Sequence, residues 1–269
     1  MKKNSLFLLT SLAGMLLFFS SCQKNLDAVK ADEVMGTPLP SSTDYCRIES
    51  IWLNPGLPDQ QFRLIAYNEF ENPTFITNPF IVTASPFRSF KYDSWHRLKE
   101  YLESYSNNNF ETWHFYGFDL SGRIGVDTSY TFGSSITGKP TNYYYRTIST
   151  FTYDAQNRII SSANVITPDP TNPMVPPSSN LQTWTYNSAG NREGPGITYD
   201  NKVNLNRTND IWMFLARDYS MNNPFTASSY NAAGYPTTIN VPFARFILSN
   251  DIFLNNSQIG YGCRPSFYH

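Results

Sequence analysis

Charged side chains are scarce in this chain. Asp, Glu, Lys and Arg make up 15% of its 269 residues, and its formal net charge is −1. Soluble globular domains usually carry about 25% charged residues. A nucleic-acid-binding protein has a basic face and an acidic disordered tail has a run of carboxylates, so this balance argues against both classes. We therefore expect no nucleic acid among the partners.

Histidine and catalytic motifs are also scarce. The three histidines, His96, His114 and His269, have a spacing that suits no zinc site. The sequence lacks a Gly-x-Ser-x-Gly elbow, a phosphate-binding glycine loop and a His-Glu-x-x-His motif. We expect no metal and no cofactor, and these gaps favour a non-enzymatic domain over an enzyme.

A long hydrophobic run is missing as well. The apolar stretch Leu6 to Phe19 is shorter than the roughly 20 residues that a membrane-spanning helix needs. It follows a basic start, Met1-Lys2-Lys3, and precedes small residues and Cys22, which is typical of a secretory signal peptide over residues 1–21. The alternative to a lipoprotein signal is an ordinary cleaved signal with Cys22 nearby by chance.

The end of this signal, "LLFFSSC", resembles a bacterial lipobox. The resemblance implies cleavage before Cys22 and lipid, palmitate included, on that cysteine. Gln23 stands where an aspartate would favour retention at the inner membrane, so the pattern favours the outer membrane of a Gram-negative cell and leaves the membrane face open. Residues 22–44 have few large apolar side chains and are expected to be a flexible tether.

Cysteine is rare too, with three in the whole chain. If Cys22 carries lipid, Cys46 and Cys263 remain as an even pair in an oxidising compartment. A bridge between them would make the first and last strands neighbours, as in a closed or nearly closed sheet. The alternative is two separate buried thiols, because free cysteine is a good small core residue.

What the chain has in abundance is a repeated short segment. An aromatic residue is followed by Asp or Asn, two variable residues, and then His, Asn or Gly. The copies are "FKYDSWHRL" at Phe90, "YGFDLSGRI" at Tyr116, "FTYDAQNRI" at Phe151, "WTYNSAGNR" at Trp184 and "SSYNAAGYP" at Ser228. The Asp or Asn suits the first position of a turn, and the residue three later is of a type that tolerates positive φ. Each copy therefore predicts a tight turn between two antiparallel strands.

Alternating β-branched and aromatic residues flank these turns. We expect an all-β fold over residues 45–269: one antiparallel β-meander of repeated hairpins, curved or barrel-like, with one short helix. The helix is predicted at Thr208 to Asp218, where Ile211, Phe214 and Leu215 have helical spacing behind a Thr cap. The alternative there is a buried strand.

Two groups of side chains are candidates for function. The turn aspartates could be catalytic carboxylates or calcium ligands, but a turn accepts Asn in place of Asp and a general acid does not, which favours a structural role. Trp52, Trp113 and Trp184 could stack on sugar rings; the alternative is that they fill sheet faces.

The five turns, together with "GITYDNKVNLN" at Gly196 to Asn206, make the chain similar to a group of uncharacterised Gram-negative lipoproteins, a domain of unknown function with a porin-like β fold. They also resemble the tyrosine-aspartate repeats of the Rhs type. The group implies no chemistry. We expect an envelope lipoprotein held by its lipid on the membrane, with a binding or scaffolding domain for a glycan or an envelope protein. The alternatives are a secreted hydrolase acting on polysaccharides and a transmembrane β-barrel.

Overall fold

Strands dominate the fold. The computed structural model describes residues 44–79, 85–105, 108–136, 138–169, 176–241 and 254–265. All of them belong to one compact unit, Pro40–His269. The expected signal peptide and most of the tether lie outside these residues.

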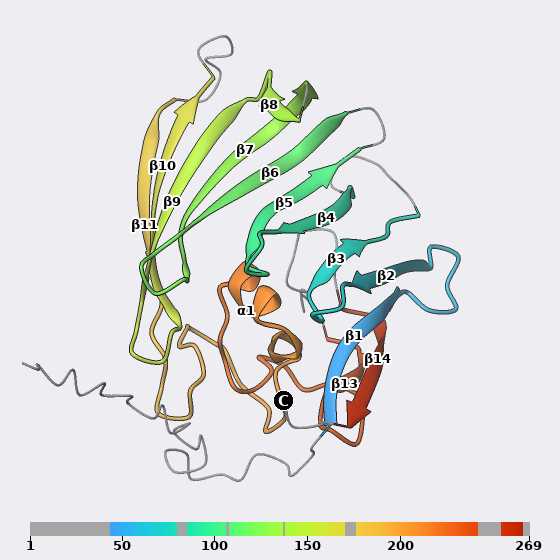
Figure 1. The fold of residues 1–269 in the computed structure, drawn as a ribbon. Helices are drawn as coiled ribbons and strands as arrows, with labels where there is room; N and C mark the ends of the chain where they lie inside the picture. The colour runs from blue at the N-terminus through green and yellow to red at the C-terminus, as the bar shows by residue number, and fades with distance from the viewer. Residues whose placement is uncertain are drawn as a thin grey trace, which may run out of the picture. The chain divides into compact units, whose positions relative to one another are not determined.

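The described residues form one 14-stranded sheet whose neighbouring strands are antiparallel (Figure 1). Its strands are β1 (Asp44–Leu53), β2 (Gln61–Tyr67), β3 (Pro73–Ile76), β4 (Phe87–Tyr92), β5 (Leu98–Ser104), β6 (Asn109–Phe118), β7 (Ile124–Ile136), β8 (Lys139–Thr141), β9 (Tyr145–Tyr153), β10 (Ile159–Pro168), β11 (Ser178–Thr183), β12 (Ser229–Tyr230), β13 (Pro236–Ile239) and β14 (Ser257–Pro265). Two short helices accompany them in the described part of the chain, η2 (Leu205–Thr208) and α1 (Asp210–Ala216).

The sheet is a meander for most of its width. Strands follow one another in the order β11-β10-β9-β7-β6-β5-β4-β3-β2-β1-β14-β13-β12, and β8 pairs only with β7. Strands β11 and β12 stand at the two ends of this order and do not pair with each other among the described residues. The all-β meander is therefore confirmed, and it is open rather than closed.

The predicted turns form at all five places. In each, the backbone N–H four residues after the Asp or Asn donates to its side-chain oxygen, at 2.9–3.0 Å. The third residue after it has positive φ: 61° at His96, 80° at Gly122, 60° at Asn157, 77° at Gly190 and 84° at Gly234. Four of the turns join paired strands, whereas the Asn187 turn closes one isolated bridge, Tyr186–Arg192.

A sixth turn of the same geometry was not predicted. Asn68 accepts hydrogen bonds from the backbone N–H groups of Phe70 and Asn72, both at 3.0 Å, between β2 and β3. The positive-φ position is Glu71, at 60°. Glutamate is not among the residues that favour this conformation, so the sequence did not mark the turn.

The helix prediction is correct in place and wrong in detail. Helix α1 begins after Asn209, whose side chain accepts from the backbone N–H of Ile211 at 2.9 Å. Thr208 is instead the last residue of η2, and its hydroxyl donates to the carbonyl of Leu205 at 2.8 Å. Asn is a strong helix cap, so it displaces the expected Thr. Arg217 ends the helix in the left-handed region.

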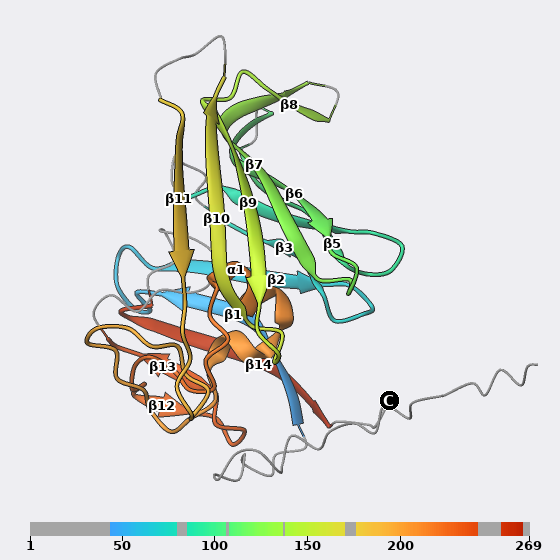
Figure 2. The ribbon, with the colours of Figure 1, turned by 90° about the vertical axis from the view of Figure 1, so that its left-hand side faces the viewer.

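Helix α1 packs on one face of the sheet, which we call the inner face. Trp212 meets Phe90 edge-on with ring centroids 5.7 Å apart, and Phe214 meets Tyr116 at 5.3 Å and Phe151 at 5.7 Å. These side chains belong to the main hydrophobic cluster, together with apolar residues of β1, β2 and β14. Figure 2 shows α1 lying against the sheet. No helix among the described residues is long and apolar enough to cross a membrane.

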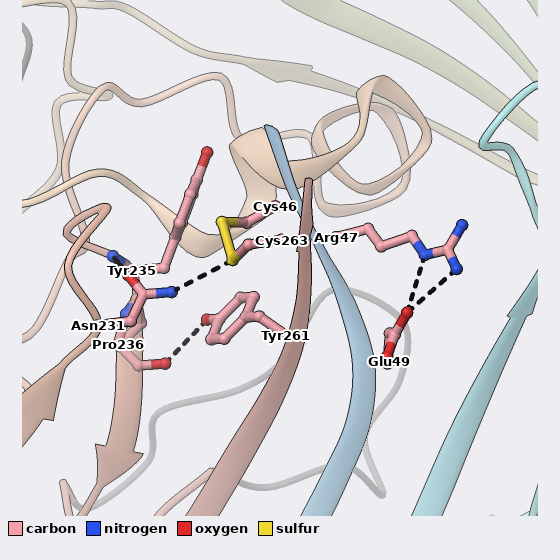
Figure 3. The surroundings of a disulfide bond; sticks show 8 residues. All are labelled: Cys46, Arg47, Glu49, Asn231, Tyr235, Pro236, Tyr261 and Cys263. Atoms are coloured by element: carbon pink, nitrogen blue, oxygen red, sulfur yellow. Dashed lines mark hydrogen bonds and ion pairs between the residues drawn. A yellow bond between two sulfur atoms is a disulfide. The ribbon is translucent and has the colours of Figure 1, made fainter. Parts of the chain in front are cut away.

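A disulfide joins the first strand to the last. Cys46 on β1 and Cys263 on β14 are register partners, with Cα atoms 4.1 Å apart. Of the two alternatives, a bridge or separate thiols, the structure contains the bridge. In Figure 3 the disulfide is drawn above the ring of Tyr261, whose hydroxyl donates to the Pro236 carbonyl at 2.8 Å, and Arg47, which donates to Glu49, extends to the right.

Candidate functional site

The three tryptophans proposed for ligand stacking do not come together. Trp113 lies on β6 with 3% of its surface exposed, so it is a core residue. Trp52 lies on β1, 37% exposed, with its ring 4.7 Å from that of Phe62. Trp184 follows β11 and packs half-buried against the core. The sheet order places four strands between β1 and β6. The shared platform is therefore wrong, because sheet position and face, which composition does not reveal, separate these rings.

Cys22, the expected lipid site, lies outside the described residues.

The turn aspartates have a structural role here. Asp93, Asp119 and Asp154 each accept two backbone N–H groups on one carboxylate oxygen and the guanidinium of the arginine four residues later on the other. Burial alone would raise the pKa of the Asp93 and Asp119 carboxyls. The arginine and the backbone N–H donors outweigh it and hold both pKa values below the usual one.

The same arginines link successive turns. Each guanidinium lies over the aromatic ring that precedes the next turn along the sheet: Arg97 over Phe118 at 3.8 Å, Arg123 over Tyr153 at 4.5 Å, and Arg158 over Tyr186 at 4.1 Å. This geometry favours cation–π attraction. Each of these arginines is thereby held by the aspartate of its own turn and by the aromatic ring of the next.

A second group of polar residues lies on the inner face, away from the turns. The strand register aligns Tyr116 on β6 with Asp127 on β7, Ser149 on β9, Asn164 on β10 and Asn180 on β11. All five positions lie on the inner face with Phe151, against which Phe214 of α1 packs, because side chains alternate along a strand. We call this line the polar row.

A parallel line lies two residues farther from the turns. It runs through His114, Ser129, Thr147, Ile166 and Ser178, again in direct register. The hydroxyls of Ser129, Thr147 and Ser149 have no hydrogen-bond partner within the described part of the chain. We call this line the histidine row.

His114 and Asp127 connect the two rows. Nδ1 of His114 lies 3.0 Å from both carboxylate oxygens of Asp127, and Nη2 of Arg217 lies 3.6 Å from one of them. A carboxylate only accepts hydrogen bonds, so Nδ1 is the nitrogen that donates to Asp127. Asp127 is 4% exposed, and its buried charge is balanced by the guanidinium.

Tyr116 stands beside this pair with its hydroxyl unsatisfied. The residue is 7% exposed, and its hydroxyl oxygen has no hydrogen-bond partner among the described residues. Burial, followed by the nearby charge of Asp127, raises the pKa of this phenol well above its usual value. A buried hydroxyl without a partner has lost its hydration with nothing in return, so a ligand or a water is expected to bond it.

The neighbouring carboxylate on β5 is saturated. Glu103 accepts from the Tyr101 hydroxyl at 2.6 Å and from the Thr112 hydroxyl at 3.0 Å. Nε of Arg88 lies 3.3 Å from Oε1 of Glu103, the same oxygen that accepts from Tyr101, and the Arg88 side chain is fully buried. Burial is the main reason that the pKa of Tyr101 is raised. This cluster holds β4, β5 and β6 together.

The segment that carried the family resemblance also has a structural role. Asp200 accepts from the amide nitrogen of Asn223 at 3.0 Å and from the hydroxyl of Tyr230 at 2.8 Å. Tyr199 donates to the carbonyl of Arg192 at 2.6 Å, and Asn204 caps η2. These bonds fix the long connection that carries α1. No group of three or more His, Cys, Asp and Glu side chains in the described ranges could hold a metal ion.

Sequence reasoning missed the two polar rows. It treated His114 only as a strand residue after Trp113 and did not single out Asp127. A signal was present: polar residues occupy the inward positions of "FETWHFYGF" and "VDTSYTF", where a buried face should be apolar. Which strands stand next to each other had to be known before the rows could be seen.

Comparisons with known proteins add little. No protein-family model matches the chain. A search of curated proteins finds no match. Among solved structures, one matching chain comes from the crystal structure of TcdB2-TccC3-Cdc42, with 15% identity and a TM-score of 0.31. The match covers 55% of this chain and 8% of that chain, and at this TM-score it carries no argument.

Proposed function

We propose that this chain is a lipid-anchored protein of a Gram-negative cell envelope, related to the lipoprotein group and the Rhs-type repeats that its turns resemble. One observation carries the proposal. Of three cysteines, Cys46 and Cys263 are joined, which leaves Cys22, at the lipobox-like position, as the third. Disulfides persist in oxidising compartments outside the cytosol, which supports an envelope location.

The folded part serves as a binding or scaffolding domain in this proposal. An open sheet leaves an inner face that is apolar where α1 covers it and polar along the rows through Tyr116 and His114. The best-supported ligand class is a glycan, because hydroxyl, amide and imidazole groups suit sugar hydroxyls. An envelope protein is the other partner considered.

Lipid anchoring is tested by growing cells that express the full chain with an alkyne-labelled palmitate. We expect the label on the wild type and its loss in Cys22→Ser. Cys263→Ser is the matched control, since it removes a cysteine that the disulfide uses and should keep the label. Equal labelling of wild type and Cys22→Ser would contradict the proposal.

A hydrolase acting on polysaccharides is the second candidate. It is favoured by the buried carboxylate Asp127, which orients an imidazole beside the unsatisfied phenol of Tyr116. The test is release of reducing ends from neutral polysaccharides by the full chain. Activity that disappears in Asp127→Asn and survives in Asp93→Asn would support it, whereas inactivity of the wild type would count against it.

A further inference from the structure

We propose that the polar row and the histidine row together bind an uncharged oligosaccharide that lies across β6, β7, β9, β10 and β11. This inference rests on the proposed glycan-binding function and moves its site from the tryptophans to the inner face. Five strands contribute one position each to the polar row, in direct register.

The length of the row sets the length of the ligand. Neighbouring strands are about 4.8 Å apart, so five strands span about 19 Å, which is the length of about four sugar units. A monosaccharide would reach at most two strands. A chain is therefore the ligand that uses the whole row.

The chemistry of the rows selects hydroxyl groups. Ser129, Thr147 and Ser149 offer hydroxyls without partners in the described ranges, and a hydroxyl both donates and accepts. Asn164 donates to the side-chain oxygen of Asn180 at 2.6 Å, which leaves the amide nitrogen of Asn180 as a donor at the outer end. Sugar hydroxyls can satisfy each of these groups.

The charges of the rows argue against a charged ligand. Asp127 is balanced by Arg217 and held by His114, and the remaining side chains of the two rows are neutral. An acidic sugar would find no free cation here, and a basic one no free carboxylate. Burying an unpaired charge is unfavourable, so a neutral sugar fits best.

The buried hydroxyl of Tyr116, at the β6 end of the polar row, supports the proposal independently of the row's length and charge. Exposure falls along the row, from Asn180, which is exposed, through the half-buried Ser149 to Tyr116 at 7%. The Tyr116 hydroxyl at this end is buried without a partner in the described residues. A sugar hydroxyl, directly or through one bridging water, supplies the missing hydrogen bond.

The test is isothermal titration of the full chain in a polyoxyethylene detergent, which carries no sugar head group. The probes are the neutral hexasaccharides of cellulose, xylan, mannan and starch, with hexagalacturonate as the acidic comparison. We expect at least one neutral hexasaccharide to bind, and hexagalacturonate not to bind.

Two variants locate the site. Tyr116→Phe and Ser149→Ala should each weaken binding about fivefold to tenfold, as for the loss of one hydrogen bond. Thr150→Ala is the matched control, because Thr150 is the exposed neighbour of Ser149 on the opposite face of β9. It should bind like the wild type. Tyr116→Phe should leave the urea midpoint unchanged or higher, since the hydroxyl it removes has no partner, and a merely structural tyrosine hydroxyl would lower it.

Three results would overturn the inference. They are no heat with any neutral hexasaccharide, hexagalacturonate binding as tightly as the neutral chains, or binding that Tyr116→Phe and Ser149→Ala leave unchanged. The first result leaves lipid labelling of Cys22 intact, so failure of the sugar site and failure of the proposed anchoring are distinguishable.

Discussion

At the scale of single residues, the choice between Asp and Asn in the turns follows the residue four positions later. Asp93, Asp119 and Asp154 precede arginines, whereas Asn187 and Asn231 precede Asn191 and Tyr235. A carboxylate has two acceptor oxygens, so it can bond the turn backbone with one and the arginine with the other. Where no arginine follows, the amide oxygen of Asn alone satisfies the backbone N–H.

The depressed pKa values of Asp93 and Asp119 predict loss of stability in acid. A carboxyl whose pKa is lower in the folded protein stabilises it above the unfolded value, near 3.9, and this contribution is lost as pH falls through the folded value. We expect the urea midpoint to fall between about pH 5 and about pH 2. The double variant Asp93→Asn, Asp119→Asn should show a shallower decrease; an identical decrease would place the acid sensitivity elsewhere.

Substitutions of Asp154 distinguish the contribution of the backbone hydrogen bonds of its turn from that of the ion pair with Arg158. Asp154→Asn keeps an acceptor for the N–H groups of Gln156 and Arg158 and loses the salt bridge. We therefore expect the free energy of unfolding to fall by less than about 1 kcal/mol. Asp154→Ala loses both, at about 1–3 kcal/mol. Urea unfolding measures the difference, and Gln156→Ala serves as the exposed control. Equal costs for Asn and Ala would mean that the ion pair dominates.

At the scale of elements, helix α1 is stabilised by the side chains that it buries against the sheet. The helix has seven residues, and isolated helices of that length are unstable in water, so its packing must maintain it. Trp212 supplies much of that packing: it is fully buried and meets Phe90 edge-on. The cap at Asn209 fixes where the helix begins, and its side chain also donates to the carbonyl of Glu71 in the unpredicted turn at 3.0 Å.

A pair of tryptophan variants tests this packing. Trp212→Ala should lower the free energy of unfolding by about 3–5 kcal/mol, because it leaves a large cavity. Trp95→Ala makes the same substitution at a residue that is 73% exposed and lies beside Arg97, and should cost about 1 kcal/mol or less. Both are measured by urea unfolding followed by circular dichroism. Similar costs at the two sites would show that α1 contributes little to the core.

At the scale of the whole molecule, the fold joins its two ends. Strand β14 pairs with β1, so the last described strand lies beside the first, and β13 and β12 follow β14 at the end of the sheet order. Figure 1 shows this as the blue and red strands side by side. The disulfide locks that pairing across 217 residues of sequence. Such a long loop loses much entropy when closed, which makes this pairing the costly long-range step of folding.

Reduction tests the disulfide. The chain-entropy model gives about 5 kcal/mol for a loop of this length, and measured values range from about 0 to 5 kcal/mol. We expect a clear fall in the urea midpoint when the wild type is unfolded with a reducing agent present. Cys46→Ser with Cys263→Ser should behave like the reduced wild type and be insensitive to the reductant. An unchanged midpoint on reduction would mean that the β1–β14 ladder suffices without the bridge.

The candidate site was less predictable than the fold. Trp113 and His114 are adjacent in the sequence, and nothing local shows that His114 lies on the inner face whereas Trp113 is buried on the opposite face, against Phe110 and Phe115. That assignment depends on strand register, because shifting a strand by one residue exchanges its two faces. The sixth turn was missed for a different reason: its positive-φ residue is Glu71, and glutamate is not a residue type that marks this conformation.

By itself, the amino-acid sequence determined the turns, the strands between them and the short helix. For Cys46 and Cys263 it left two alternatives, a bridge or two separate thiols. The turns, strands and helix depend on contacts within a few residues: Asp or Asn oxygens with backbone N–H groups, and side-chain alternation along a strand. Only the tertiary structure decided that the sheet stays open, that Cys46 meets Cys263, and that Tyr116, Asp127 and Ser149 form one row. Those outcomes join residues far apart in the chain, and they depend on which strands pair and in which register.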